Sequence, residues 1–302
     1  MDERPVARDV TVVIPTVGRP LLEGCLESIV AGTVWPAEVV VVDQGRTDVT
    51  VPWIDRLTRS GVAITHVRSG DTGIAAGTNR GLERVRTPFV ATTHDDCRAR
   101  IDWLETLAAR VRTVGDAIVT GRVEPEGDGL VLTIVTSPHP RTYTGPMIDR
   151  DVLFPPNMAF PIRLVERIGY LDEHPSLRLA GEDNEWAYRA LRAGIPIVYD
   201  PEIVVAHVAW QDPRRVRHVY RRYAMGQGAF YGKYVRRGDP FILRRTARDL
   251  LRAPWLVLRG LVTRNAELRA MGLGELTGLP AGLAAGLRNG RRIVGSAGRT
   301  GR

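Results

Sequence analysis

The chain has 302 residues, of which 44% are hydrophobic and 25% charged, and it carries a formal net charge of +8. This composition is typical of a globular protein with one large or two small domains, and two cysteines, Cys25 and Cys97, are too few for a disulfide framework. No apolar run approaches the roughly 20 residues of a membrane-spanning helix, and the first residues lack the order of a secretion signal, so we expect a cytoplasmic protein.

Short strands and helices alternate through the first third of the chain. Apolar runs and helically spaced apolar residues predict strands at 10–14, 38–42, 63–67 and 89–93, and helices at 21–30 and 73–85. Strands that are apolar throughout are buried on both faces, as in parallel sheets. The alternation therefore predicts an α/β fold, a doubly wound and mostly parallel sheet with helices on both faces.

Polar residues follow three of these strands, at the edge where ligands bind in doubly wound sheets. Pro15 and Thr16 end the first strand, Asp43 ends the second, and residues 94–96 (His-Asp-Asp) follow the fourth. Because the carboxyl ends of parallel strands meet at one edge, we expect these residues to share a crevice.

The middle of the chain is less regular. Residues 121–156 predict short strands joined by turns rich in Pro and Gly. Helices are predicted at 161–168 and 182–193, and strands within 195–205 on either side of Pro201.

The last third of the chain is strongly basic. Residues 214–302 contain 20 Lys and Arg against 4 Asp and Glu, a local net charge of +16, while the first 213 residues carry −8. This segregation indicates an anionic partner for the C-terminal region. We therefore expect a catalytic domain at 1–212 and a basic helical region at 213–302.

Three segments make up that basic region. In residues 214–234 arginines alternate with aromatic residues. Residues 241–258 are amphipathic, with a kink or break expected at Pro254. The last thirty residues, rich in Gly, Leu and Ala, are expected to be mobile.

Two pairs of adjacent carboxylates, Asp95-Asp96 and Glu182-Asp183, and the distant His207 are the candidate chemical groups. Adjacent like charges raise each other's pKa unless a cation lies between them. The pattern is typical of a metal–diphosphate site with a separate general base, as in sugar-transferring enzymes.

The order of eight short motifs resembles the family 2 glycosyltransferases of the GT-A fold. These motifs lie at residues 12–16, 40–48, 77–81, 94–96, 157–160, 169–173, 181–183 and 204–207. The resemblance covers roughly residues 9–210. It implies inverting transfer of a sugar, of the hexosyl type, from a nucleotide-diphosphate sugar to a hydroxyl acceptor, with a divalent cation. A cell-envelope polysaccharide or lipid-linked glycan is the expected acceptor, and residues 121–156 are interpreted as an insertion facing it.

Six residues are the candidate nucleotide-binding set: Pro15, Thr16, Asp43 and Asp95 at or after strand ends, Gly73 at the start of a predicted helix, and Asn79 within that helix. Asp43 can accept a hydrogen bond from the N–H of a uracil-like base, or it can cap the following turn. Pro15 and Thr16 would hold the first loop against the base. At Gly73 small residues open a helix whose amides could approach a diphosphate, although a tight turn explains the glycine equally well.

Asp96 is the predicted metal ligand, because Mg²⁺ or Mn²⁺ takes one or two carboxylates together with phosphate oxygens. The chain departs from the resembled family here, since His94 stands where that family has the first acid of its D-x-D motif. His94 could bind Mn²⁺ or contact a ribose. His207 could complete the metal shell, as the resemblance implies, or be a buried histidine.

Asp183 is the predicted general base, with Glu182 beside it. The acceptor hydroxyl must lose a proton as it attacks the anomeric carbon, and a carboxylate at a helix start can take it. The alternative is that the two acids stabilise the helix N-terminus, and both roles are compatible.

Interleaved arginines and aromatics in the C-terminal region favour attachment to an anionic membrane surface, at the inner face of the cell membrane. Nucleic-acid binding is the disfavoured alternative, since no nucleic-acid motif is present, and docking of these helices on the catalytic domain is a third interpretation. Two other functions stay open: a sugar nucleotidyltransferase, and an inactive module that binds nucleotide sugars or polyanions. A dehydrogenase is disfavoured, because no G-x-G-x-x-G follows the first strand.

Overall fold

The computed structural model describes residues 4–129, 131, 134–148, 155–178, 180–210 and 212–289. The chain divides into two compact units that interleave along the sequence. The first comprises Met1–Leu171 with Trp186–Gln211, and the second comprises Asp172–Glu185 with Asp212–Arg302. The division into a catalytic domain at 1–212 and a basic region at 213–302 stays a prediction about function.

Within the described residues, nine strands of the first unit form one sheet. They are β1 (Val6–Thr16), β2 (Trp35–Asp43), β3 (Ile64–Arg68), β4 (Phe89–Thr92), β5 (Cys97–Ala99), β6 (Ile118–Glu126), β7 (Arg141–Tyr143), β8 (Met158–Pro161) and β9 (Ile197–Val208). Their order is β3-β2-β1-β4-β8-β6-β9-β5, with β7 also pairing with β9. The pairs that β1 forms with β2 and β4, and β2 with β3, are parallel, whereas β8 runs antiparallel to β4 and β6.

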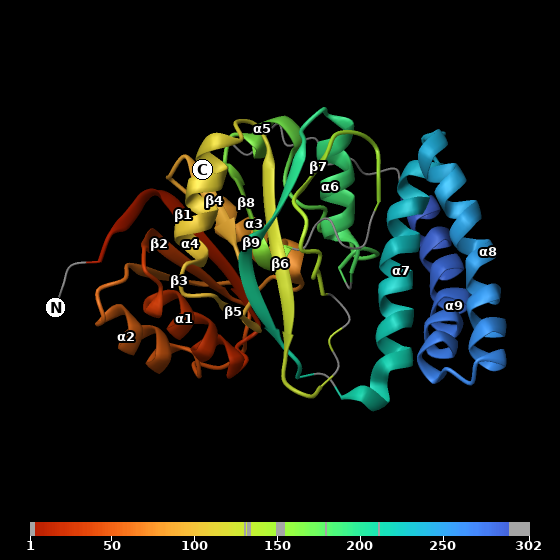
Figure 1. The fold of residues 1–302 in the computed structure, drawn as a ribbon, viewed down its shortest axis with the longest axis horizontal. Coiled ribbons are helices and arrows are strands. Elements are labelled where there is room, and N and C mark those ends of the chain that lie inside the picture. The colour runs from red at the N-terminus through yellow and green to blue at the C-terminus, as the bar shows by residue number, and fades with distance from the viewer. Residues whose placement is uncertain are drawn as a thin grey trace. The chain divides into compact units, whose positions relative to one another are not determined.

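Helices lie on both faces of this sheet (Figure 1). They are α1 (Leu21–Ala31), α2 (Val51–Thr58), α3 (Ile74–Leu82), α4 (Trp103–Thr113), α5 (Leu164–Ile168) and α6 (Glu182–Arg192), which starts in the second unit, and 3₁₀ turns span Pro155–Asn157 and Pro213–Arg215. The predicted α/β class, with helices on both faces of the sheet, is confirmed, and the sheet is mixed: parallel among β1 to β4, with antiparallel pairs at β8, β5 and β7.

The predicted elements of the first 93 residues are present with bounds shifted by a few residues. The short elements α2, β5 and α4 were not predicted. Pro201 does not separate two strands, because β9 runs through it. The register of β6 against β9 jumps from Asp200 to Val204, and this bulge removes the proline from the hydrogen-bonded ladder.

The core of the first unit lies between the sheet and its helices. The central segments of β1, β2 and β4 are buried, and Trp103, Phe160 and Trp186 are among the large side chains of the core. The Phe160 and Trp186 rings lie 4.9 Å apart between centroids. The polar residues that follow β1, β2 and β4 are attached to this packed core.

Three long helices, α7 (Val216–Val235), α8 (Pro240–Val262) and α9 (Ala266–Asn289), form the second unit with residues 172–185 (Figure 1). Helix α8 continues through Pro254, so the helix does not break there, and a kink at this residue stays a prediction. None of the described helices is long and apolar enough to cross a membrane.

The prediction that the last thirty residues are mobile was wrong for residues 273–289, which form most of α9; residues 290–302 lie outside the described residues. Glycines recur at every fourth position of α9, and this spacing places them on one helix face. A Cβ at Gly282 would lie 1.9 Å from the Met225 carbonyl oxygen on α7. The glycines therefore allow the backbones of α7 and α9 to pack closely.

We predict that Gly282→Ala lowers the free energy of unfolding by roughly 1–3 kcal/mol, because the added methyl group forces α9 away from α7. Helix propensity alone would make the alanine variant more stable by about 1 kcal/mol. The sign of the change in the free energy of unfolding therefore distinguishes a closely packed helix from a mobile one. Urea denaturation followed by circular dichroism measures the change. The control is Gly70→Ala, where a Cβ meets nothing within 4 Å. Equal or higher stability of Gly282→Ala would contradict the close packing.

Candidate active site

The ends of β1, β2 and β4 bring three predicted residues to one edge of the first unit. Thr16 lies opposite Asp43 in the parallel register of β1 and β2, and β4 pairs with the other side of β1. The Thr16 hydroxyl donates to Asp95 Oδ2 at 2.6 Å. The topology therefore places these residues together, as expected from the carboxyl-edge rule.

The carboxylates of Asp95 and Asp96 are bridged by a guanidinium group. Arg19 Nη2 contacts Asp95 Oδ1 at 2.6 Å, its Nε contacts Asp95 Oδ2 at 3.1 Å, and its Nη1 contacts Asp96 Oδ2 at 3.1 Å. Asp95 has no exposed surface. Arg19 is thus a cation between the two acids, a role that the sequence analysis had given to a metal alone.

Asp96 accepts a further bond from the side chain that follows β9. Trp210 Nε1 donates to Asp96 Oδ2 at 2.9 Å, and the Arg19 guanidinium stacks over the Trp210 ring at 4.8 Å from its centroid. Burial alone would raise the pKa of Asp96, but the hydrogen bond from His207 and the charge of Arg19 help to outweigh it and hold the pKa of this carboxyl below its usual range. Asp96 is therefore ionised at neutral pH.

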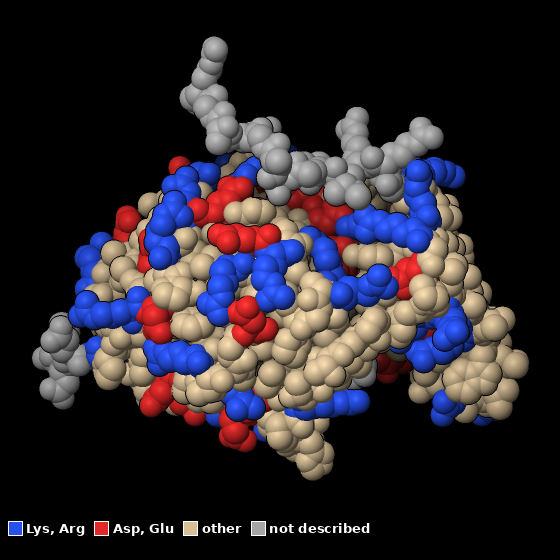
Figure 2. Space-filling model, turned by 90° about the horizontal axis from the view of Figure 1, so that it is seen from above, with Lys and Arg blue, Asp and Glu red and all other residues tan. Residues whose placement is uncertain are grey.

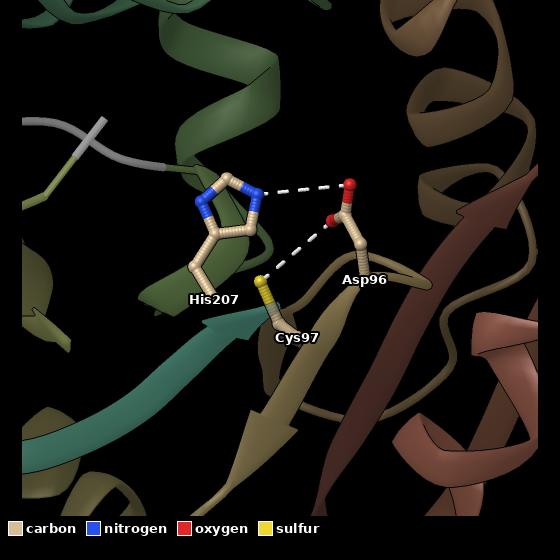
Figure 3. A group of neighbouring side chains, drawn as sticks. All are labelled: Asp96, Cys97 and His207. Atoms are coloured by element: carbon tan, nitrogen blue, oxygen red, sulfur yellow. Dashed lines mark hydrogen bonds and ion pairs between the residues drawn. The ribbon is translucent and has the colours of Figure 1, made fainter. Parts of the chain in front are cut away.

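Asp96, Cys97 and His207 form the one group of potential metal ligands found among the described residues (Figure 3). One ligand atom from each lies within 4.8 Å of the others, and His207 Nε2 is 3.6 Å from Asp96 Oδ2. Cys97 and His207 face each other in the antiparallel register of β5 and β9. Burial raises the pKa of the Cys97 thiol well above its usual range, so the thiol stays protonated.

These donors fit a divalent cation in part. An ionised carboxylate and an imidazole are ligands that Mn²⁺ accepts, whereas a protonated thiol adds nothing for a hard cation. His94 lies outside this group, and its Nε2 is buried without a hydrogen-bond partner. Burial lowers the pKa of His94 to about 4, so its ring is neutral. The ligand roles of Asp96, His207 and His94 stay predictions.

Asp43 is fully buried and receives four hydrogen bonds from within the chain. The Gly45 amide donates to Oδ1 at 2.7 Å, which is the turn-capping interaction considered for this residue. Oδ2 lies within hydrogen-bond distance of donors on Thr50, His66 and Arg68. Contact of Asp43 with a nucleotide base stays a prediction.

Gly73 and Asn79 belong to the start and middle of α3. Gly73 has φ of 108°, a conformation that favours glycine, and Gln44 Nε2 donates to its carbonyl oxygen at 3.1 Å. The amide of Asn79 bonds the backbone of Leu171 twice, at 2.9 and 3.0 Å. Asn79 therefore ties α3 to Leu171, where the first sequence segment of this unit ends. Its predicted nucleotide contact stays a prediction.

The second acidic pair lies at the start of α6, within the second unit. The backbone enters the helix through Gly181, whose φ is 92° and whose Cβ would lie 2.8 Å from the Gly226 carbonyl group on α7. Glu182 is buried and its Oε2 has no hydrogen-bond partner. Asp183 Oδ1 accepts the Asn184 amide at 2.7 Å.

Burial raises the pKa of both acids, and the charge of Asp183 adds to the effect on Glu182. The charge of Arg222 opposes the shift of Glu182 but does not cancel it. The pair therefore retains a proton near neutral pH, on Glu182 in preference to Asp183. An ionised Asp183 beside a protonated Glu182 is a suitable arrangement for a general base.

Lys233, the only lysine of the chain, anchors the segment that carries this pair. Its Nζ contacts Asp172 Oδ2 at 2.6 Å and Glu185 Oε1 at 2.8 Å, and the Tyr234 hydroxyl donates to the same Glu185 oxygen. Sequence analysis missed both Lys233 and Arg19. The available signals were that Lys233 is the only lysine and that Arg19 follows the motif at residues 12–16. The partners of both residues are far away along the chain, so the sequence did not reveal the contacts.

Residues 11–164, just over half of the chain, match the family model described as glycosyl transferase family 2. The O-antigen chain rhamnosyltransferase RfbN of Salmonella typhimurium is 25% identical over 295 residues, a match that covers 88% of this chain and 89% of that protein. Glycosyltransferase GlyA of Streptococcus pneumoniae is 27% identical over 103 residues, which are 34% of this chain and 15% of GlyA.

Solved structures share the fold. The mannosyltransferase PcManGT of Pyrobaculum calidifontis, in complex with GDP-Man and Mn²⁺, superposes with a TM-score of 0.61 at 19% identity over 95% of this chain and 88% of that one. TarS 1–349 of S. aureus in complex with UDP gives 0.56 at 16% identity over 88% and 90%. This chain spans 43% of a longer TarS structure. These likenesses confirm the predicted GT-A fold.

We predict that Arg19→Met lowers the free energy of unfolding by roughly 2–4 kcal/mol at pH 7, because it leaves the buried Asp95 without its countercharge. The loss should shrink toward pH 4. Burial raises the pKa of Asp95 in the folded state, although Arg19 opposes the shift. A carboxyl with a raised folded-state pKa binds a proton more tightly when folded, so protonation at low pH offsets the destabilisation. Denaturation curves at both pH values measure this.

The matched control is Arg56→Met. Arg56 is exposed and pairs with the half-buried Glu23 and the exposed Glu27, so its removal should cost no more than about 1 kcal/mol. Equal costs for the two variants would show that Arg19 does not neutralise the acidic pair.

Proposed function

We propose that this chain, which belongs to glycosyl transferase family 2, transfers a hexosyl group from a nucleotide-diphosphate sugar to a hydroxyl acceptor with inversion at the anomeric carbon. Relatives support the donor class, since structures that share the fold contain GDP-Man, UDP or UDP-GlcNAc. The name of RfbN supports a cell-envelope polysaccharide or lipid-linked glycan as the acceptor. The sugar nucleotidyltransferase alternative is disfavoured by the family to which the chain belongs.

The observation that carries the proposal is the convergence of Thr16, Asp43 and the Asp95-Asp96 pair at one sheet edge within residues 11–164. We assign Asp43, Pro15 and Thr16 to the side of the base, and the acidic pair to the side of the diphosphate. Arg19 serves both functions of a local cation: its charge favours the ionised form of Asp96 and adds positive charge for phosphate oxygens.

A divalent cation, Mg²⁺ or Mn²⁺, would be held by Asp96 and His207, with His94 as a further candidate. When bound, such a cation neutralises the charge of a departing diphosphate. The Mn²⁺ complexes of related structures support this assignment.

Asp183 takes the acceptor proton in this proposal. The hydroxyl oxygen forms the new bond to the anomeric carbon, the bond to the diphosphate oxygen breaks, and the proton moves to the Asp183 carboxylate. A single displacement of this kind inverts the anomeric configuration. Glu182 holds its own proton and leaves Asp183 free to ionise.

We further propose that the enzyme works at the inner face of the cell membrane, attached through its basic C-terminal region. The local net charge of +16 over residues 214–302 supports an anionic surface as partner. An acceptor linked to lipid would place the reaction at that surface.

We predict that Asp183→Asn lowers the transfer rate by at least about 100-fold, because an amide cannot accept the proton, while nucleotide binding persists. In the unaltered enzyme kcat/KM should rise with pH through about 6, where Asp183 ionises, and then level off. Initial rates with UDP-, GDP- and dTDP-sugars measure both. Asp55→Asn, at an exposed position of α2, is the control. Retained turnover in Asp183→Asn would remove this residue as the base.

We predict that one of UDP, GDP or dTDP binds with micromolar affinity in the presence of Mn²⁺ or Mg²⁺. The affinity should fall by tenfold or more with EDTA or in Asp96→Asn, because Asp96 would lose its role as ligand. Isothermal titration calorimetry measures it. Nucleotide affinity that does not change when the metal is removed would assign neutralisation of the diphosphate to Arg19 instead. A lack of binding by all three nucleotides would favour the inactive-module alternative.

A further inference from the structure

Helix α8 carries apolar side chains on two faces. One face is buried in the second unit through Ile242, Ala253 and Leu256. The opposite face exposes large apolar residues spaced three or four apart, and their exposed fractions are 74% for Leu251, 52% for Trp255, 61% for Leu258 and 77% for Val262. This spacing places the four on one stripe of the helix.

Arginines flank that stripe. Arg244, Arg248 and Arg259 are exposed on the same side of α8, and the Arg259 guanidinium lies 5.1 Å from the centroid of the Trp255 ring. The one acid of α8, Asp249, is buried and bonded to Tyr231 and Arg245. The exposed face of α8 is therefore apolar and cationic. In Figure 2 the right-hand margin, where α8 lies in Figure 1, shows tan and blue side chains.

We propose that this face, defined by Leu251, Trp255, Leu258, Val262 and the flanking arginines, docks onto the anionic surface of a lipid bilayer. A helix lying in the membrane interface needs apolar side chains toward the acyl chains and cations at the level of the headgroups. A tryptophan at the boundary is suited to the same depth. The proposal deepens the membrane partner named in the proposed function, and its test measures lipid binding without sugar transfer.

Charge decides between lipid and a second copy of this chain. A two-fold interface through α8 would place these arginines near the same arginines of the partner, with no exposed acid on the helix to pair them. Nucleic acid would satisfy the cations but leave the apolar stripe in water. An anionic bilayer satisfies both parts of the face.

Three aromatic residues in the second half of α7 do not share this role. Phe230, Tyr231 and Tyr234 are buried in the second unit, and the Phe230 ring packs against both tyrosines. The alternation of arginines and aromatics in residues 214–234 therefore describes a helix with a packed face. The membrane-facing surface lies on α8 instead.

The test is co-sedimentation of the full chain with vesicles of phosphatidylcholine alone or with 30% phosphatidylglycerol, a composition of roughly the anionic content that attracts basic segments. We expect binding to the anionic vesicles that weakens between low and high salt. Leu251→Ser with Leu258→Ser should reduce affinity by about tenfold or more, and Arg244→Gln with Arg248→Gln and Arg259→Gln by on the order of 100-fold. Circular dichroism and thermal melting establish that the variants are folded.

Matched controls carry the same changes on the first unit. Ile101→Ser alters an apolar residue that is 61% exposed, and Arg8→Gln with Arg59→Gln and Arg84→Gln removes three exposed arginines. These variants should bind as the unaltered chain does. Brominated phosphatidylglycerol should quench the fluorescence of the unaltered chain, and Trp255→Phe should remove most of that quenching.

Three results would overturn the proposal. The first is binding that the α8 variants and the control variants change equally. The second is a concentration-dependent dimer, seen by sedimentation, that the Leu251 and Leu258 changes abolish while vesicles are not bound. The third is that the chain does not bind vesicles but binds single-stranded oligonucleotides in a manner that depends on the α8 arginines.

Discussion

Two adjacent carboxylates at the end of a buried strand are the constraint on which the first unit depends. Asp95 has no exposed surface, and a charge there would cost several kcal/mol without a partner. Arg19 provides that partner and contacts Asp96 as well. Thr16 at the end of β1 and Trp210 after β9 complete the hydrogen bonds. One electrostatic requirement therefore ties the loop after β1 and the segment after β9 to the end of β4.

The second acidic pair is also buried, but it retains a proton. Burial raises the pKa of both Glu182 and Asp183, and the charge of Arg222 does not cancel the shift of Glu182, so one proton is retained. Asp96, by contrast, stays ionised because cationic and imidazole groups surround it. Two similar pairs in the sequence thus have different proton occupancy in the fold. The ionised Asp96 carboxylate suits cations and phosphate, whereas a pair that exchanges a proton near neutral pH suits general base catalysis.

Local patterns predicted the parts of the fold that have local causes. Continuous apolar runs located β1, β2 and β4, and the acids at their ends marked the candidate site. Arg19 was missed because 76 residues separate it from Asp95, and no periodicity connects the two. The glycines of α9 indicated mobility by composition, yet their spacing of four serves a contact with α7 that the sequence of α9 alone does not reveal. Roles for Asp43 and Asn79 depend on a ligand, so the fold alone leaves them as predictions.

Net charge predicts an anionic partner for the C-terminal region but does not indicate which surface would bind it. Burial separates the helices: Tyr231 of α7 belongs to the core, whereas Leu251 and Trp255 of α8 are exposed. The second unit already packs against the buried face of α8, so the exposed stripe is not needed for folding. Exposed apolar surface that no core requires favours association, because a partner that covers it removes its contact with water. The arginines beside it then restrict that partner to one of negative charge.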